Sequence, residues 1–223
     1  RGTIARNSET RVPLLYNVSV GKTLIPYYGS TSQGSKTIIG VGTEIKSVGA
    51  YTVIKTGMTS DVYDYVLYQD GVSRVTIITN GKDNVLTYDG ASFKNVLNRR
   101  IAYNEDGTIK GYYDANEKLK TTEAEVTTYA PKGRFAELHY NRLWFAGIDG
   151  EEDTLYFSKD FDIHDYTIPT DEENANQHGG FIEVPSYDGS VVIGLKVVFN
   201  DLVVFKEKSA FRIFGNSPSN YNL

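Results

Sequence analysis

The chain has 223 residues, of which 40% are hydrophobic and 13% aromatic, so it can bury a core and is not expected to be disordered. Its net charge of −5 argues against a broad surface that binds nucleic acid. It contains no cysteine, which excludes a disulfide framework, a thiolate metal site and a cysteine nucleophile. No apolar run approaches the roughly 20 residues of a membrane-spanning helix, so no membrane-spanning segment is expected.

The sequence begins with Arg1 instead of Met, which suggests a processed chain or a fragment of a longer one.

The N-terminal third has residue patterns that are typical of short strands joined by turns. Runs of β-branched and aromatic residues are separated by Gly, Ser and Asn, as strands are separated by turns. These runs are LLYNVSVG (14–21), TLIPYYG (23–29), KTIIGVG (36–42) and YTVIKTG (51–57). We expect them to form one further unit of the repeat that follows.

The rest of the chain contains a repeated unit, found at residues 64–96, 134–167 and 192–223. In each unit a first strand leads through a tight turn to a more apolar second strand, and a polar hairpin then leads to a third strand. The second strands are expected at Val75–Thr79, Leu143–Ala146 and Leu202–Phe205, and the third strands at Val85–Tyr88, Thr154–Ser158 and Ala210–Phe214. Because the second strand is flanked on both sides, it should be the most buried.

Two polar insertions lengthen the repeat to about 60 to 70 residues, more than the roughly 40–45 of a WD40 blade. Residues 99–129 are expected to form a hairpin insertion, and residues 169–180 an acidic loop. The clearest helix candidate is Asn116–Ala124, which is short and polar and is interpreted as a loop or a single turn.

These patterns predict an all-β fold, a single propeller-like domain over residues 1–223 built from antiparallel meanders of three to four strands. A β-sandwich is the alternative, because strands of unrelated sheets also resemble one another. Three units alone are too few to close a ring of the usual four to eight blades. An incomplete ring, or one closed by residues outside this chain, is therefore among the expected outcomes.

Candidate chemical groups are few. The three histidines, His139, His164 and His178, show no zinc-ligand spacing, and the chain has no G-x-S-x-G nucleophile turn. Asp160, Asp162 and Asp165 form a cluster of candidate calcium ligands, but they do not match the EF-hand pattern. They are interpreted as turn-capping residues of a solvated loop.

The remaining polar and aromatic features also have structural interpretations. Residues 149–153 carry four carboxylates at a hairpin tip, where exposure prevents the pKa shift that glycoside hydrolysis requires. Trp144 is expected to be a core aromatic, not a sugar-stacking platform. Arg99-Arg100 and Lys118–Lys120 are too small for a nucleic-acid footprint. No catalytic, cofactor-binding or metal residue is assigned, no cofactor is expected, and the chain is predicted not to be an enzyme.

The second and third units carry a family resemblance. The string RFAELHYNRLWFAG (134–147), followed by DTLYFSKDFDIHDYT (153–167), resembles a strand pair and hairpin in tail and neck proteins of tailed bacteriophages. VVIGLKVVFNDLVVFKEKSAFRIFG (191–215) resembles the apolar strand pair that follows there. Tyr166 stands where a Trp is more usual. The matching positions are Leu138, Asn141, Arg142, Leu143, Tyr156, Ser158, Asp165, Gly194, Leu195, Leu202, Phe205, Lys206 and Gly215.

The resemblance implies a structural protein of the virion, similar to the tail nozzle or tubular proteins of short-tailed phages. It implies a homo-oligomeric ring around the DNA exit channel, with portal, adaptor or tail subunits as partners and at most non-specific passage of double-stranded DNA. Two alternatives stay open at this point. One is a carbohydrate-binding propeller that recognises a receptor or glycan, since Tyr is abundant and could stack on sugars. The other is a propeller hydrolase or lyase, which would need a buried carboxylate or histidine.

Overall fold

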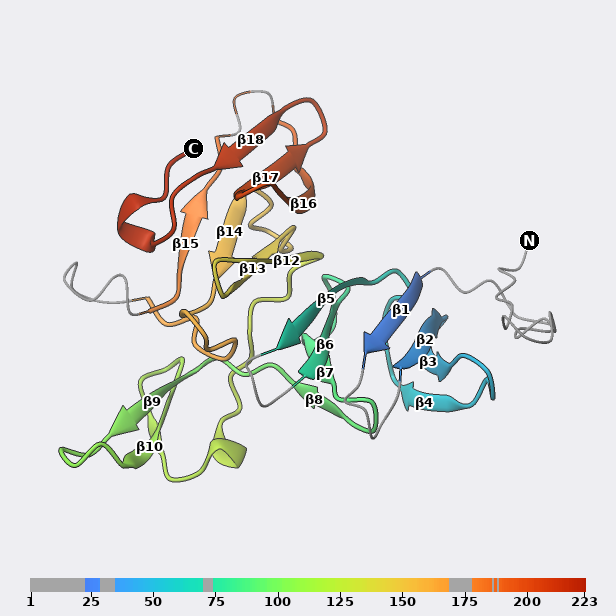
Figure 1. Cartoon of the computed structure of the whole chain (residues 1–223), viewed down its shortest axis with the longest axis horizontal. Coiled ribbons are helices and arrows are strands. Elements are labelled where there is room, and N and C mark those ends of the chain that lie inside the picture. Colours follow the sequence, from blue (N-terminus) through green and yellow to red (C-terminus); the bar gives the residue numbers. More distant parts are fainter. Residues whose placement is uncertain (1–22, 29–34, 70–73, 169–177, 186, 188) are drawn as a thin grey trace.

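The computed structural model describes residues 23–28, 35–69, 74–168, 178–185, 187 and 189–223, and this part of the chain is all-β (Figure 1). Its strands form five small antiparallel sheets, with no closed barrel. In every sheet the neighbouring strands are also neighbours in the sequence, so each sheet is a meander. The all-β prediction is therefore confirmed. Among the described residues no helix is long and apolar enough to cross a membrane.

Three sheets have four strands. The first contains β1 (Thr23–Tyr28), β2 (Ser35–Val41), β3 (Glu44–Ser47) and β4 (Val53–Thr56). The second contains β5 (Asp64–Gln69), β6 (Arg74–Thr79), β7 (Leu86–Tyr88) and β8 (Phe93–Asn95). The third of these contains β12 (Phe135–His139), β13 (Arg142–Ala146), β14 (Thr154–Phe157) and β15 (Gly180–Glu183).

Two sheets have three strands. The insertion sheet contains β9 (Arg99–Tyr103), β10 (Ile109–Asp114) and β11 (Leu119–Lys120), and a single 3-10 turn, η1 (Glu123–Glu125), follows it. The last sheet contains β16 (Val192–Val198), β17 (Asp201–Lys206) and β18 (Ala210–Ile213), followed by a second 3-10 turn, η3 (Pro218–Asn220).

The sheets of the repeat pack face to face, and the alternation of side chains along the middle strands explains why. Successive residues of a strand point to opposite faces of its sheet. In β6, Ile77 joins the core shared with the β12–β15 sheet, while Ile78 joins the core shared with the β1–β4 sheet. In β13, Phe145 faces the β5–β8 sheet and Trp144 faces the β16–β18 sheet. The two inner sheets are thus covered on both faces, as in a propeller-like array.

The sheets follow one another from β1–β4 on the right of Figure 1 to β16–β18 at the upper left. The β9–β10 hairpin projects at the lower left, away from this series (Figure 1). The first and last sheets of the series therefore lie at opposite ends of it.

The structure adds strands that the sequence pattern did not separate. β8 and β15 give the first two units a fourth strand, and β3 lies between two of the expected N-terminal strands. The predicted insertion hairpin has a third short strand, β11. The helix candidate Asn116–Ala124 forms only that strand and the start of a single 3-10 turn. The expected strand at residues 14–21 and residues 169–177 of the acidic loop lie outside the described residues.

Candidate functional site

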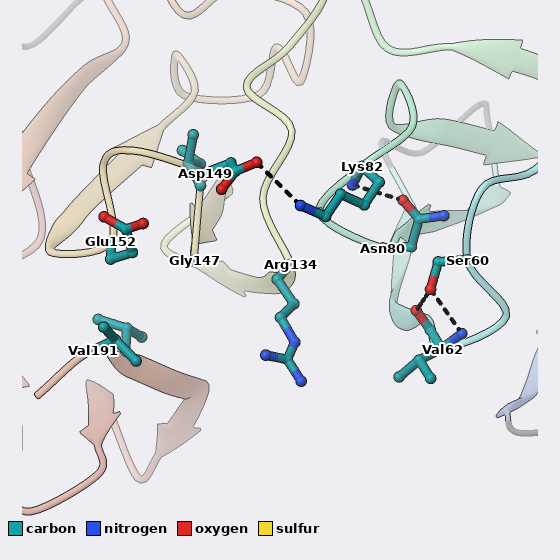
Figure 2. A pocket seen from close by; sticks show the side chains of 12 residues that line it. Ser60, Val62, Asn80, Lys82, Arg134, Gly147, Asp149, Glu152 and Val191 are labelled. Carbon is teal, nitrogen blue, oxygen red and sulfur yellow. Dashed lines mark hydrogen bonds and ion pairs between the residues drawn. The ribbon is translucent and has the colours of Figure 1, made fainter.

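Loops from three consecutive sheets meet around a pocket of about 370 Å³ (Figure 2). Ser60 and Val62 come from the segment before β5, and Lys82 comes from the β6–β7 hairpin. Asp149 and Glu152 come from the β13–β14 segment, while Arg134 precedes β12 and Val191 precedes β16. Because β5, β12 and β16 are the first strands of consecutive sheets, this pocket lies on the side where those strands begin.

The Asn80-Gly81 turn fixes one wall of this pocket. Asn80 Oδ1 accepts hydrogen bonds from the backbone N–H groups of Lys82 (3.0 Å) and Asp83 (2.9 Å). Gly81 has a φ of 74°, and a Cβ at this position would lie 3.0 Å from the Cβ of Arg134. A glycine therefore suits both the backbone conformation and the close approach of the two loops. The ion pair between Lys82 Nζ and Asp149 Oδ2, 3.1 Å long, crosses the pocket (Figure 2).

Asp83 ties the same hairpin to the preceding sheet. Its carboxylate accepts hydrogen bonds from the backbone N–H and the hydroxyl of Thr59, each 2.9 Å long, and from Asn80 Nδ2 at 2.7 Å. Burial alone would raise the pKa of Asp83, but these hydrogen bonds to the charged form outweigh it and lower the pKa. The charged Asp83 carboxylate thus connects the β6–β7 hairpin to the segment that contains Thr59.

The carboxylates expected at the hairpin tip divide into two groups. Asp149, Glu151 and Glu152 are exposed, as the sequence suggested. Asp153 differs, because its Oδ1 lies 2.8 Å from Nζ of Lys206, whose side chain is fully buried. An exposed carboxylate is solvated by water and lacks the environment that makes a catalytic acid. The charged side chains that line this pocket include Lys82, Asp149 and Glu152.

The three histidines lie in three different environments. His139 is buried in β12, and its Nε2 lies 2.8 Å from the carbonyl oxygen of Asn200. His164 Nδ1 accepts the backbone N–H of Leu97 at 2.9 Å. His178 Nδ1 lies 3.9 Å from Asp165 Oδ2. Burial and the nearby Arg99 lower the pKa of His164, so it is neutral at pH 7.

Asp160, Asp162 and Asp165 lie in different environments. Asp160 is exposed, Asp162 pairs with Arg99, and Asp165 accepts a hydrogen bond from the backbone N–H of Thr167 at 3.1 Å. Burial raises the pKa of Asp165. Residues 23–223, apart from the gaps named above, contain no group of three or more His, Asp or Glu residues arranged to hold a metal ion.

The network around Arg99 was missed at the sequence level. Arg99 Nη1 lies 2.6 Å from Asp162 Oδ2, and its Nε lies 2.7 Å from Glu123 Oε1. The sequence marked Arg99 only as part of a small basic pair, because its acidic partners are far away along the chain. The one available signal was a pair of arginines, Arg99 and Arg100, directly before the apolar residues Ile101 and Ala102.

No family model matches this chain, and a search of the curated proteins found no match.

Trp144 is fully buried and contacts the rings of Phe157 and Tyr221 at 4.8 and 5.1 Å between centroids. It is a core residue, as expected.

Proposed function

We propose that this chain is a structural subunit of a bacteriophage tail or neck, similar to nozzle proteins, that assembles into a ring around the DNA exit channel. On this proposal it is located in the virion, its partners are portal, adaptor or other tail subunits, and it acts without catalysis. The resemblance of residues 134–215 to such proteins supports the proposal.

The positions that carry the resemblance have structural tasks, which fits a protein that acts by shape. Arg142 is buried, and its Nη1 donates to the carbonyl oxygens of Ser158 (2.8 Å) and His178 (2.7 Å). The Ser158 hydroxyl accepts the backbone N–H of Leu143 at 3.0 Å. Lys206 binds Asp153 across neighbouring elements. The contacts of Arg142 and Ser158 hold the β12–β15 sheet together, and the Lys206–Asp153 pair joins it to the β16–β18 sheet.

The observation that carries the proposal is a face of the β16–β18 sheet that is uncovered among the described residues and that carries Val203 and Phe205 beside the charged Lys196 and Arg212. β6 has four consecutive buried residues, and all five residues of β13 are buried. In β17 burial alternates instead, with Leu202 and Val204 buried while Phe205 is 40% exposed. Phe214, which directly follows β18, is also 40% exposed. Exposed aromatic side chains and arginine are enriched at protein–protein interfaces.

The charge balance is compatible with a DNA conduit. A net charge of −5 disfavours tight binding to the phosphate backbone, which itself carries dense negative charge. DNA could then pass such a subunit without being held.

Molar mass measured by light scattering, together with electron microscopy, tests the assembly. We expect a ring, formed by this chain alone or with neighbouring virion proteins, and we expect Phe205→Glu to weaken its formation at least tenfold. Leu119→Glu is the matched control, because Leu119 is 44% exposed but lies on the insertion sheet.

A monomer under all these conditions, including in the presence of neighbouring virion proteins, would overturn the proposal. Equal assembly of the wild type and the Phe205→Glu variant would show that the β16–β18 face is not the assembly surface. Far-UV circular dichroism of each variant confirms that it is folded before its mass is interpreted.

A further inference from the structure

A second cavity, of about 530 Å³, lies on a different set of elements. It is bounded by the β5–β8 sheet, by β9 of the insertion sheet and by residues 159–164 after β14. Its lining combines aromatic side chains with cationic ones, including Tyr68, Lys94, Tyr103, Lys159 and Phe161. None of these residues contributes to the uncovered β16–β18 face, so this cavity is independent of the assembly proposal.

Contacts between distant parts of the chain hold the walls of this cavity. Arg99 of β9 is bound to Asp162 at 2.6 Å, and Asp162 Oδ1 accepts the backbone N–H of His164 at 3.0 Å. From the β5–β8 sheet, Tyr68 Oη donates to the carbonyl oxygen of Phe161 at 3.3 Å. Walls that are already fixed lose little conformational entropy when a ligand binds.

Two aromatic side chains at this cavity are unusually exposed. Phe161 is 66% exposed and Tyr103 is 56% exposed. Phe161 also has a φ of 56°, in the left-handed region that few residues other than glycine adopt. Backbone strain of this kind persists only where the surrounding structure enforces it, and it occurs preferentially at binding sites. The apolar C–H face of a sugar ring packs well on an aromatic ring, whose face carries partial negative charge.

Two lysines supply charge to the same cavity. Lys94 projects from β8, and Lys159 follows β14. Neither lysine has a carboxylate within 4.0 Å among the described residues, whereas the guanidinium of Arg99 is already neutralised by two carboxylates. An anionic group can therefore pair with one or both ammonium groups without first breaking an ion pair.

We propose that this cavity binds an acidic carbohydrate, in which a sugar ring stacks on Phe161 or Tyr103 and a carboxylate or phosphate on the sugar pairs with Lys94 and Lys159. The same residues are less suited to nucleic acid. A nucleic-acid backbone needs a longer row of cations, and the chain as a whole is acidic.

Titration calorimetry with defined oligosaccharides tests this site in the full chain. The probes are an oligogalacturonate, a phosphorylated oligosaccharide, a neutral oligosaccharide of equal length and a single-stranded oligonucleotide. We expect at least one acidic probe to bind at least tenfold more tightly than the neutral one, and to bind more weakly as salt is raised. The comparison of the two acidic probes identifies the anionic group.

Three variants locate the binding. Lys94→Gln combined with Lys159→Gln should weaken binding at least tenfold, and Phe161→Asn at least fivefold, because Asn tolerates the left-handed backbone but cannot stack. Lys55→Gln, on the distant β4 strand, is the matched control and should bind as the wild type does. Thermal melting confirms that every variant is folded.

Failure of both acidic probes to bind would overturn the proposal. So would equal affinities for the wild type and the two cavity variants, or a preference for the oligonucleotide over both acidic sugars. None of these results depends on whether the chain forms a ring.

Discussion

Arg99 of β9 lies 2.6 Å from Asp162, in the loop after β14, and this ion pair joins the insertion sheet to the main series of sheets. The Arg99 side chain is only 8% exposed, and Asp162 is 19% exposed. Glu123 accepts a second bond from the same guanidinium at 2.7 Å. The buried guanidinium of Arg99 thus holds the insertion sheet, which has little core of its own, against the main series of sheets.

Arg99→Met should reduce the free energy of unfolding by about 2–3 kcal/mol, because it leaves the partly buried Asp162 carboxylate unpaired. Arg100→Met is the control. Arg100 binds Glu117 at 2.9 Å near the surface, where such a pair contributes at most about 1 kcal/mol. Urea denaturation measures both values, and equal effects of the two substitutions would contradict the assigned role of Arg99.

His164 should make the protein less stable in mild acid. Its pKa is lowered in the folded state by burial and by Arg99, with Asp162 and Glu123 opposing this effect in part. The unfolded chain therefore binds a proton more readily, and stability falls as the pH drops below about 6.5, the ordinary histidine pKa. The stability is regained as the pH rises above that value.

His164→Asn tests this pH dependence. The Asn side chain can still accept the Leu97 N–H that His164 Nδ1 accepts, but it does not titrate. We expect a smaller loss of stability between pH 7 and pH 5 in this variant than in the wild type, measured by urea denaturation at each pH. An unchanged slope would assign the acid sensitivity to other groups.

The sequence predicted the positions of the strands more accurately than it predicted which faces of those strands are covered by other sheets. The expected second strands Val75–Thr79, Leu143–Ala146 and Leu202–Phe205 agree with β6, β13 and β17 to within a residue at each end. Apolar and β-branched runs specify a strand locally, which explains this success. The same pattern cannot show that one face of β17 stays uncovered, because that depends on which sheet lies next to it.

The candidate sites were harder to predict for the same reason. Arg99 and Asp162 are 63 positions apart, and the cavity beside them is formed by the β5–β8 sheet, by β9 and by the loop after β14. Nothing in the sequence indicated that Phe161 is exposed or has a positive φ. Both properties arise from the loop that the ion pair of Arg99 with Asp162 holds in place. Residues that gain their role from tertiary contacts are not visible in local patterns.

The Lys206–Asp153 pair should respond differently to the removal of each partner. The Lys206 side chain is fully buried, while Asp153 is 37% exposed. Asp153→Ala leaves a buried ammonium whose remaining acceptor, among the described residues, is the carbonyl oxygen of Pro185 (3.1 Å), and should cost about 3 kcal/mol. Lys206→Met should cost less, because Asp153 can turn to water. Denaturation of both variants checks the order, and a larger cost for Lys206→Met would contradict it.

Gly90 should tolerate no side chain, because it lies against a ring from the neighbouring sheet. Its φ is 92°, and a Cβ would overlap with Cε1 of Tyr27, which belongs to the core between the β1–β4 and β5–β8 sheets. Gly42 is a matched control, since its φ of 59° is also positive but a Cβ there would meet nothing within 4 Å. Gly42→Ala should therefore cost about 1 kcal/mol, the cost of the backbone conformation alone. Gly90→Ala adds the displacement of a buried ring and should cost about 3 kcal/mol. Thermal and urea unfolding compare the two, and equal costs would mean that Tyr27 moves aside freely and that the two sheets are not tightly packed at this point.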